Sequence, residues 1–206
     1  MRRLRATVIG NGVAGFGGGF EVLDSDSDIA VETQEVGPGF KLFIEGYDLI
    51  IVPNGSDHVA MHRNAAMVRR HLDRGGALFC FDGWVTPWIP GNAWVMDNSK
   101  PSREMRYRTA APGHPLLEGV DLEALSTYHG VQGWWACGYI DPAPGAEVLL
   151  EDSWGRAVLV LDAATTPGTM ALTASGPLGE WKCESPTGVA VSRLYRNLIA
   201  FTRSRP

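Results

Sequence analysis

Short, unbroken apolar runs recur along the chain and predict buried strands of a parallel sheet. The clearest run is Tyr47–Pro53, and similar runs cover Leu4–Ile9 and Ala77–Phe81. A continuous apolar run is what a strand covered on both faces requires. Weaker patterns over Ile29–Val36 and Thr169–Ala174 predict two further strands.

Helical spacing follows the strand at 47–53. One helical face is formed by apolar residues at spacings of four, three and four, namely Met61, Ala65, Val68 and Leu72. Ser56 or Asp57 can cap the start of this helix, and Gly75-Gly76 ends it. Strand, helix and strand together predict a βαβ unit with a right-handed crossover.

The pattern becomes irregular after residue 83. Residues 84–113 contain four prolines and predict a long loop, which in a compact domain is usually functional. Segments 147–150 and 157–161 predict a hairpin, and Val189–Arg203 predicts a closing helix. No linker or repeat divides the chain, so we expect one domain over residues 1–206.

Composition narrows the class of protein. The chain has 206 residues, a net charge of −5 and 45% hydrophobic residues, which argues against a disordered tail or a basic nucleic-acid binder. No apolar run reaches the roughly 18 residues of a membrane span. Three scattered cysteines without a CxxC pair indicate reduced thiols rather than a metal knuckle. We expect a cytoplasmic protein with a small-molecule ligand, no metal, cofactor, nucleic acid or membrane partner, and homo-oligomerisation left open.

A glycine motif directly follows the first strand. Residues 10–15 read Gly-Asn-Gly-Val-Ala-Gly, which matches the dinucleotide-binding fingerprint, and Glu32 or Glu35 could be its acidic partner. The motif is followed by Phe-Gly-Gly-Gly, and glycines weaken the helix that the fingerprint needs. The alternative is a glycine loop that turns the chain around a different ligand.

Residues 47–203 resemble the class I glutamine amidotransferase-like superfamily, and most nearly its trehalose-utilisation (ThuA-like) branch. The likeness is carried by the strand at 47–53, the helix ending in Gly75-Gly76, the segment 114–120 (His-Pro-Leu-Leu-Glu-Gly-Val), the strand at 169–174 and the segment 194–201. The resemblance implies an α/β, flavodoxin-like three-layer sandwich with a mostly parallel central sheet. Ligands of such sheets bind at the carboxyl ends of the strands.

The chain departs from the amidotransferase pattern where the chemistry should be. Those enzymes place a nucleophilic cysteine on a sharp turn, typically G-x-C-x-G, and activate it with a His-x-Glu pair. Matching the strand at 77–81 puts Asp82 at the turn and Gly83 after it, whereas Cys80 falls inside the strand. Residues 176–181 contain no His-x-Glu. The departure argues against glutamine hydrolysis by a Cys-His-Glu triad.

The candidate catalytic residues are Asp82 and His129. Asp82 could be an acid–base group or ligand clamp, or could form an Asx-type turn. His129 lies where ThuA-like proteins carry a polar strand that faces the pocket. The candidate ligand-binding residues are Gly10, Asn11, Gly12, Asn54, Gly83, Trp84 and Trp88. The tryptophans could form an aromatic wall or could instead cover the core.

Three functions remain open at this point. The leading hypothesis is a ThuA-like protein that binds or acts on a carbohydrate or related polar metabolite, with enzymatic activity undecided. The alternatives are a non-catalytic amidotransferase-like subunit or assembly module and a nucleotide-binding protein that uses the glycine loop. His58 and His62 have a spacing that can bind metal, but a solvated helix face is the preferred interpretation for them and His71.

Overall fold

A parallel sheet organises the chain in the computed structural model, which describes residues 3–10, 29–81, 83–128, 131–132, 137–174 and 186–204. Five strands run parallel in the order β2–β1–β3–β4–β12. They are β1 (Leu4–Gly10), β2 (Ile29–Glu35), β3 (Leu49–Val52), β4 (Ala77–Cys80) and β12 (Thr169–Thr173). The predicted α/β class with a mostly parallel central sheet is confirmed.

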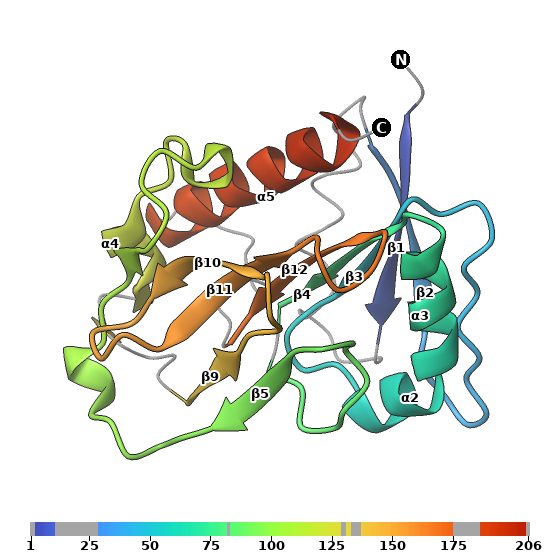
Figure 1. Ribbon diagram of the computed structural model, residues 1–206, viewed down its shortest axis with the longest axis horizontal. Coiled ribbons are helices and arrows are strands. Elements are labelled where there is room, and N and C mark those ends of the chain that lie inside the picture. The colour runs from blue at the N-terminus through green and yellow to red at the C-terminus, as the bar shows by residue number, and fades with distance from the viewer. Residues whose placement is uncertain are drawn as a thin grey trace.

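Antiparallel strands extend this sheet beyond β12 (Figure 1). They are β11 (Ala157–Asp162), β10 (Glu147–Glu151), β6 (Arg108–Thr109), β9 (Gly138–Asp141) and β5 (Ala93–Met96), while β7 (Thr127–Tyr128) and β8 (Val131–Gln132) form a separate pair. The predicted hairpin is therefore β10–β11. The expected loop over 84–113 is wrong in part, because β5 and β6 lie within it. Both are short, and their partners are distant in sequence, so no local pattern marks them.

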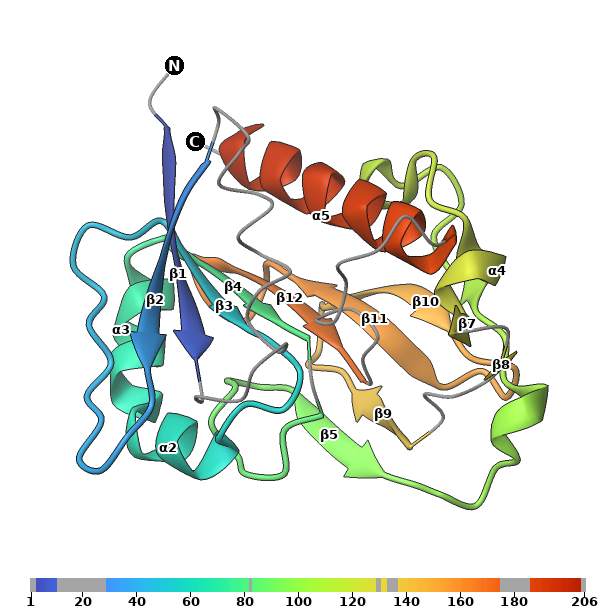
Figure 2. The same ribbon diagram turned by 180° about the vertical axis from the view of Figure 1, so that it is seen from behind.

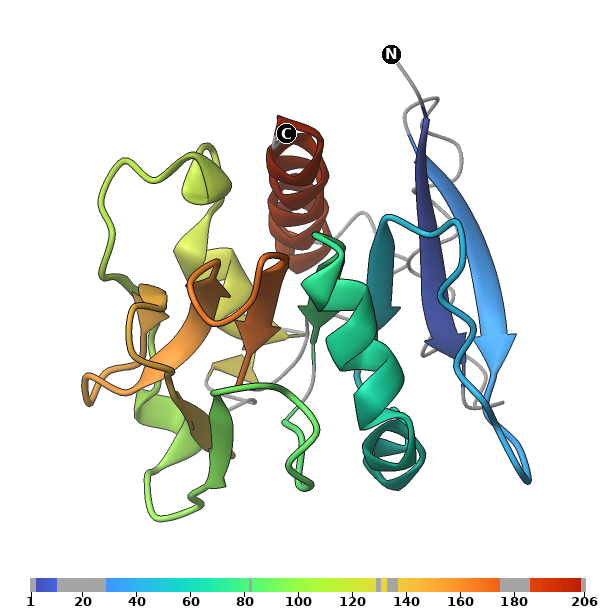
Figure 3. The same cartoon turned by 45° about the vertical axis from the view of Figure 1, so that its right-hand side comes forward.

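The main helices cover opposite faces of the sheet. α3 (Ala65–Asp73) lies on one face and the long α5 (Pro186–Ser204) on the other, as the two opposite views and the turned view show (Figures 1, 2 and 3). Shorter helical turns are α2 (His58–Arg63), α4 (Leu122–Leu125), η1 (Ser102–Glu104) and η2 (Pro115–Leu117). Among the described helices, none combines the length and apolar character that crossing a membrane requires.

The predicted helix after Asp57 is two helices, because Asn64 interrupts it. Asp57 caps α2 as expected, accepting hydrogen bonds from the amides of Val59 and Ala60. Asn64 then separates α2 from α3, and its side chain is buried rather than solvated. Met61 in α2 and Val68 in α3 are both buried in the core. The apolar spacing in the sequence is therefore the same for one helix as for two, and it did not predict the break.

The Asn64 side-chain amide joins α2 and α3 to the segment that connects β2 with β3. Its Oδ1 accepts from the amide of Leu42 at 2.8 Å. Its Nδ2 donates to the carbonyl oxygens of Ala60 at 2.9 Å and Phe40 at 3.3 Å. Buried polar groups need such partners, so one side chain satisfies three backbone groups at this junction.

We expect Asn64→Ala to destabilise the fold by about 2–3 kcal/mol, because it leaves the buried Leu42 amide without its acceptor. Urea unfolding followed by circular dichroism measures the loss. Asn98→Ala is the matched control, because Asn98 is exposed. Equal stability of the two variants would show that the Asn64 contacts contribute nothing.

A second buried network holds the loop that follows β4. Asp162, at the end of β11, is fully buried and accepts from the amides of Ala164 and Thr165 and from the Thr165 hydroxyl. It also accepts from Asn92 Nδ2 at 2.7 Å. Asn92 Oδ1 accepts in turn from the Ala143 amide at 2.9 Å. The segment leading into β5 is therefore fixed to two other parts of the chain.

Burial opposes ionisation of Asp162, but hydrogen bonds from Thr165, Asn92 and Ala164 outweigh burial and hold its pKa below the ordinary value. A depressed carboxyl pKa stabilises the fold above the unfolded-state pKa. This stabilisation disappears as the pH falls through the folded-state value.

Asp162→Asn should therefore lower stability by about 2 kcal/mol near neutral pH, with the difference from wild type shrinking below about pH 4. Urea unfolding between pH 6 and pH 3 checks this pH dependence. The exposed Asp141→Asn provides the control. A constant difference for Asp162→Asn across that range would rule out the ionised carboxylate as the cause.

Candidate functional site

The carboxyl ends of the parallel strands meet at one edge of the sheet, which the arrowheads of β1 and β2 mark in Figure 2. β1 is followed in sequence by β2 on one side of it, and the later strands lie on its other side. The strand order thus reverses between β1 and β3. In open α/β sheets ligands bind in the crevice at such a point. This edge is therefore the first candidate site.

Gly10 ends β1 at this reversal point and brings a carboxylate there. Gly10 pairs with Glu35 at the end of β2. A Cβ added to Gly10 would lie 2.6 Å from Glu35 Oε1, so only glycine allows this side chain to cross β1. The predicted residues Asn11 and Gly12 lie outside the described residues. From the sequence, Glu35 was predicted only as one of two possible acidic partners of the glycine motif.

Asn54 stands at the carboxyl end of β3, as predicted. The turn after β3 is set by Gly55, with φ of 78°, and by Ser56, whose Oγ donates to the Pro53 carbonyl at 2.6 Å. Asn54 is half-buried, and its side chain makes no hydrogen bond within the described part of the chain. A half-buried amide of this kind retains its capacity to bind a polar ligand.

A tryptophan clamp holds the carboxyl ends of β4 and β12. Trp94, in β5, donates from Nε1 to the Ala174 carbonyl at 2.6 Å. A Cβ on Gly83 would lie 2.2 Å from Trp94 Cε2, and one on Gly138 would lie 2.6 Å from Cζ2. Two glycines are therefore required for the ring to fit. Gly83 is placed at the edge by this contact, which the sequence pattern did not reveal.

Trp84 and Trp88 are both part of the hydrophobic core, with exposed fractions of only 2%. Trp88 Nε1 donates to His58 Nδ1 at 3.2 Å, and the two rings stack with centroids 5.9 Å apart. Of the two interpretations of the tryptophans, the one in which they cover the core therefore holds for Trp84 and Trp88. They support the loop after β4 and offer little surface to a ligand.

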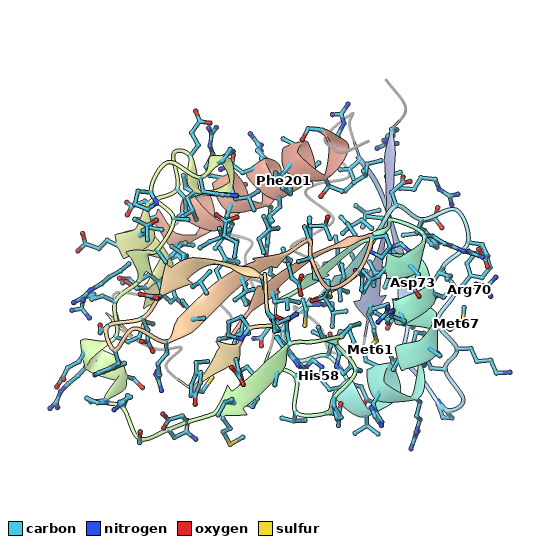
Figure 4. The ribbon with its side chains drawn as sticks, viewed as in Figure 1. His58, Met61, Met67, Arg70, Asp73 and Phe201 are labelled. Atoms are coloured by element: carbon cyan, nitrogen blue, oxygen red, sulfur yellow. The ribbon has the colours of Figure 1, made fainter. Side chains whose placement is uncertain are left out.

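The expectation of a solvated histidine face is wrong for two of its three residues. His58, labelled in Figure 4 where α2 begins, is buried against Trp88. His71 in α3 is 3% exposed, and its Nε2 lies 3.0 Å from the Ala77 carbonyl, to which it donates. Burial lowers the pKa of His71. Both rings turn inward because each has a buried hydrogen-bonding partner.

Cys80 is completely buried within β4, between β3 and β12. The thiol is therefore part of the core and lies before the edge rather than on it. The predicted catalytic residues Asp82 and His129 lie outside the described residues. In sequence, Asp82 stands between Phe81 and Gly83, both of which are placed at the carboxyl end of β4.

A separate cavity of about 540 Å³ lies at the opposite, amino edge of the sheet. It is lined by Arg3, Leu4, Ile44, Glu45, Gly46, Tyr47, Asp48, His71, Arg74, Gly75, Gly76, Thr202 and Arg203. None of the predicted site residues belongs to this cavity. The sequence did not indicate it, because its walls come from segments that are far apart in the chain.

No protein-family model matches the sequence, and no curated protein matches it. Solved structures do match. A glutamine amidotransferase from Thermotoga maritima has a TM-score of 0.69 at 10% identity over 100% of both chains.

Two further solved structures match the chain. A glutamine amidotransferase from Methylobacillus flagellatus has a TM-score of 0.59 at 10% identity, covering 98% of this chain and 77% of that one. A chain of PurLQS from Thermotoga maritima has a TM-score of 0.59 at 13% identity, covering 97% and 99%. At such identities the likeness shows the fold alone. The chain therefore has an α/β fold with a mostly parallel, mixed central sheet of the glutamine amidotransferase-like, flavodoxin-like type.

Proposed function

We propose that the chain is a cytoplasmic, ThuA-like protein that binds or acts on a carbohydrate or related small polar metabolite, and that it does not hydrolyse glutamine with Cys80 as nucleophile. The observation that carries the proposal is the position of Cys80. Its thiol is fully buried inside β4, so a substrate at the carboxyl edge does not reach it. A thiolate must be accessible to attack, and a buried cysteine in an apolar strand behaves as a small hydrophobe.

The groups proposed to bind the metabolite stand around the strand reversal. Asn54 offers a half-buried amide, whereas Gly10 and Gly83 are buried and allow Glu35 and Trp94 to lie against the strand ends. An amide side chain can donate to and accept from the hydroxyls of a sugar. Asp82, between Phe81 and Gly83 in sequence, is the proposed acid–base or clamping group, and His129 the proposed second polar group.

The binding proposal is tested by thermal shift with trehalose, glucose and glutamine. We expect a sugar to raise the melting temperature of the wild type, and Asp82→Asn to keep the fold but lose that shift. Cys80→Ala, the comparison variant, should keep the shift. If the wild type releases ammonia from glutamine and Cys80→Ala does not, the proposal is overturned and the protein is a glutamine-hydrolysing amidotransferase.

A second test concerns the clamp that positions Gly83. Gly83→Ala drives a methyl group into the Trp94 ring, and overpacking of this kind costs about 1–3 kcal/mol. Urea unfolding should show this loss and its partial recovery in Gly83→Ala/Trp94→Leu. Gly37→Ala is the control, because nothing lies within 4 Å of a Cβ at Gly37. Unchanged stability of Gly83→Ala would contradict the described contact.

Nucleotide binding is a second candidate function, favoured by one observation. The Glu35 carboxylate lies against Gly10 at the end of β2. In dinucleotide-binding folds an acidic residue about 20 residues after the glycine motif binds the ribose hydroxyl. A thermal shift with NAD that Glu35→Gln abolishes would favour this function. Absence of a shift with NAD or FAD would exclude it.

A further inference from the structure

We draw no further inference here: the strongest candidate, the pair of buried polar atoms that have no hydrogen-bond partner within the described part of the chain, Thr173 Oγ1 at the end of β12 and Trp84 Nε1 after β4, belongs to the carboxyl edge already described, and both atoms are too deeply buried for a ligand to reach.

Discussion

The shared burial of β3, β4 and β12 is the constraint on which the rest of the structure depends. Every residue of these three strands is buried, with α3 and α5 on opposite faces. Burying one large aliphatic side chain contributes about 1.5–3 kcal/mol, so the strands supply much of the driving force for folding. Strands of this kind have no free face, and polar chemistry is therefore confined to the two edges where they begin and end.

The two edges of the sheet differ in the segments that lie there, which are turns at the carboxyl edge and helix ends at the amino edge. At the carboxyl edge the strands open into turns with glycine and asparagine, and Trp94 of β5 packs against Gly83 and binds the Ala174 carbonyl there. At the amino edge the helices end, and arginines gather beside their carbonyl ends. The antiparallel strands therefore support the candidate site by packing against it, and they provide none of the residues proposed to bind the ligand.

The burial of Cys80 connects the fold to the proposed chemistry. The solved amidotransferases share the arrangement of the sheet with this chain, at 10% identity. In the present chain the cysteine nearest the end of β4 belongs to the ladder, where its thiol packs as an apolar group. Retaining a sheet while changing the groups at its edge is how one fold comes to serve different reactions.

The sequence by itself determined the parallel strands, the capped helix start at Asp57 and the closing helix, because apolar runs and caps act between near neighbours. It also placed Gly10, Asn54 and Gly83 at strand ends. Only the tertiary structure reveals the break at Asn64, the buried histidines His58 and His71, strand β5 with Trp94, and the cavity at the amino edge. Each of these depends on partners distant in sequence, such as Leu42 for Asn64 and Gly138 for Trp94, and no local periodicity records such contacts.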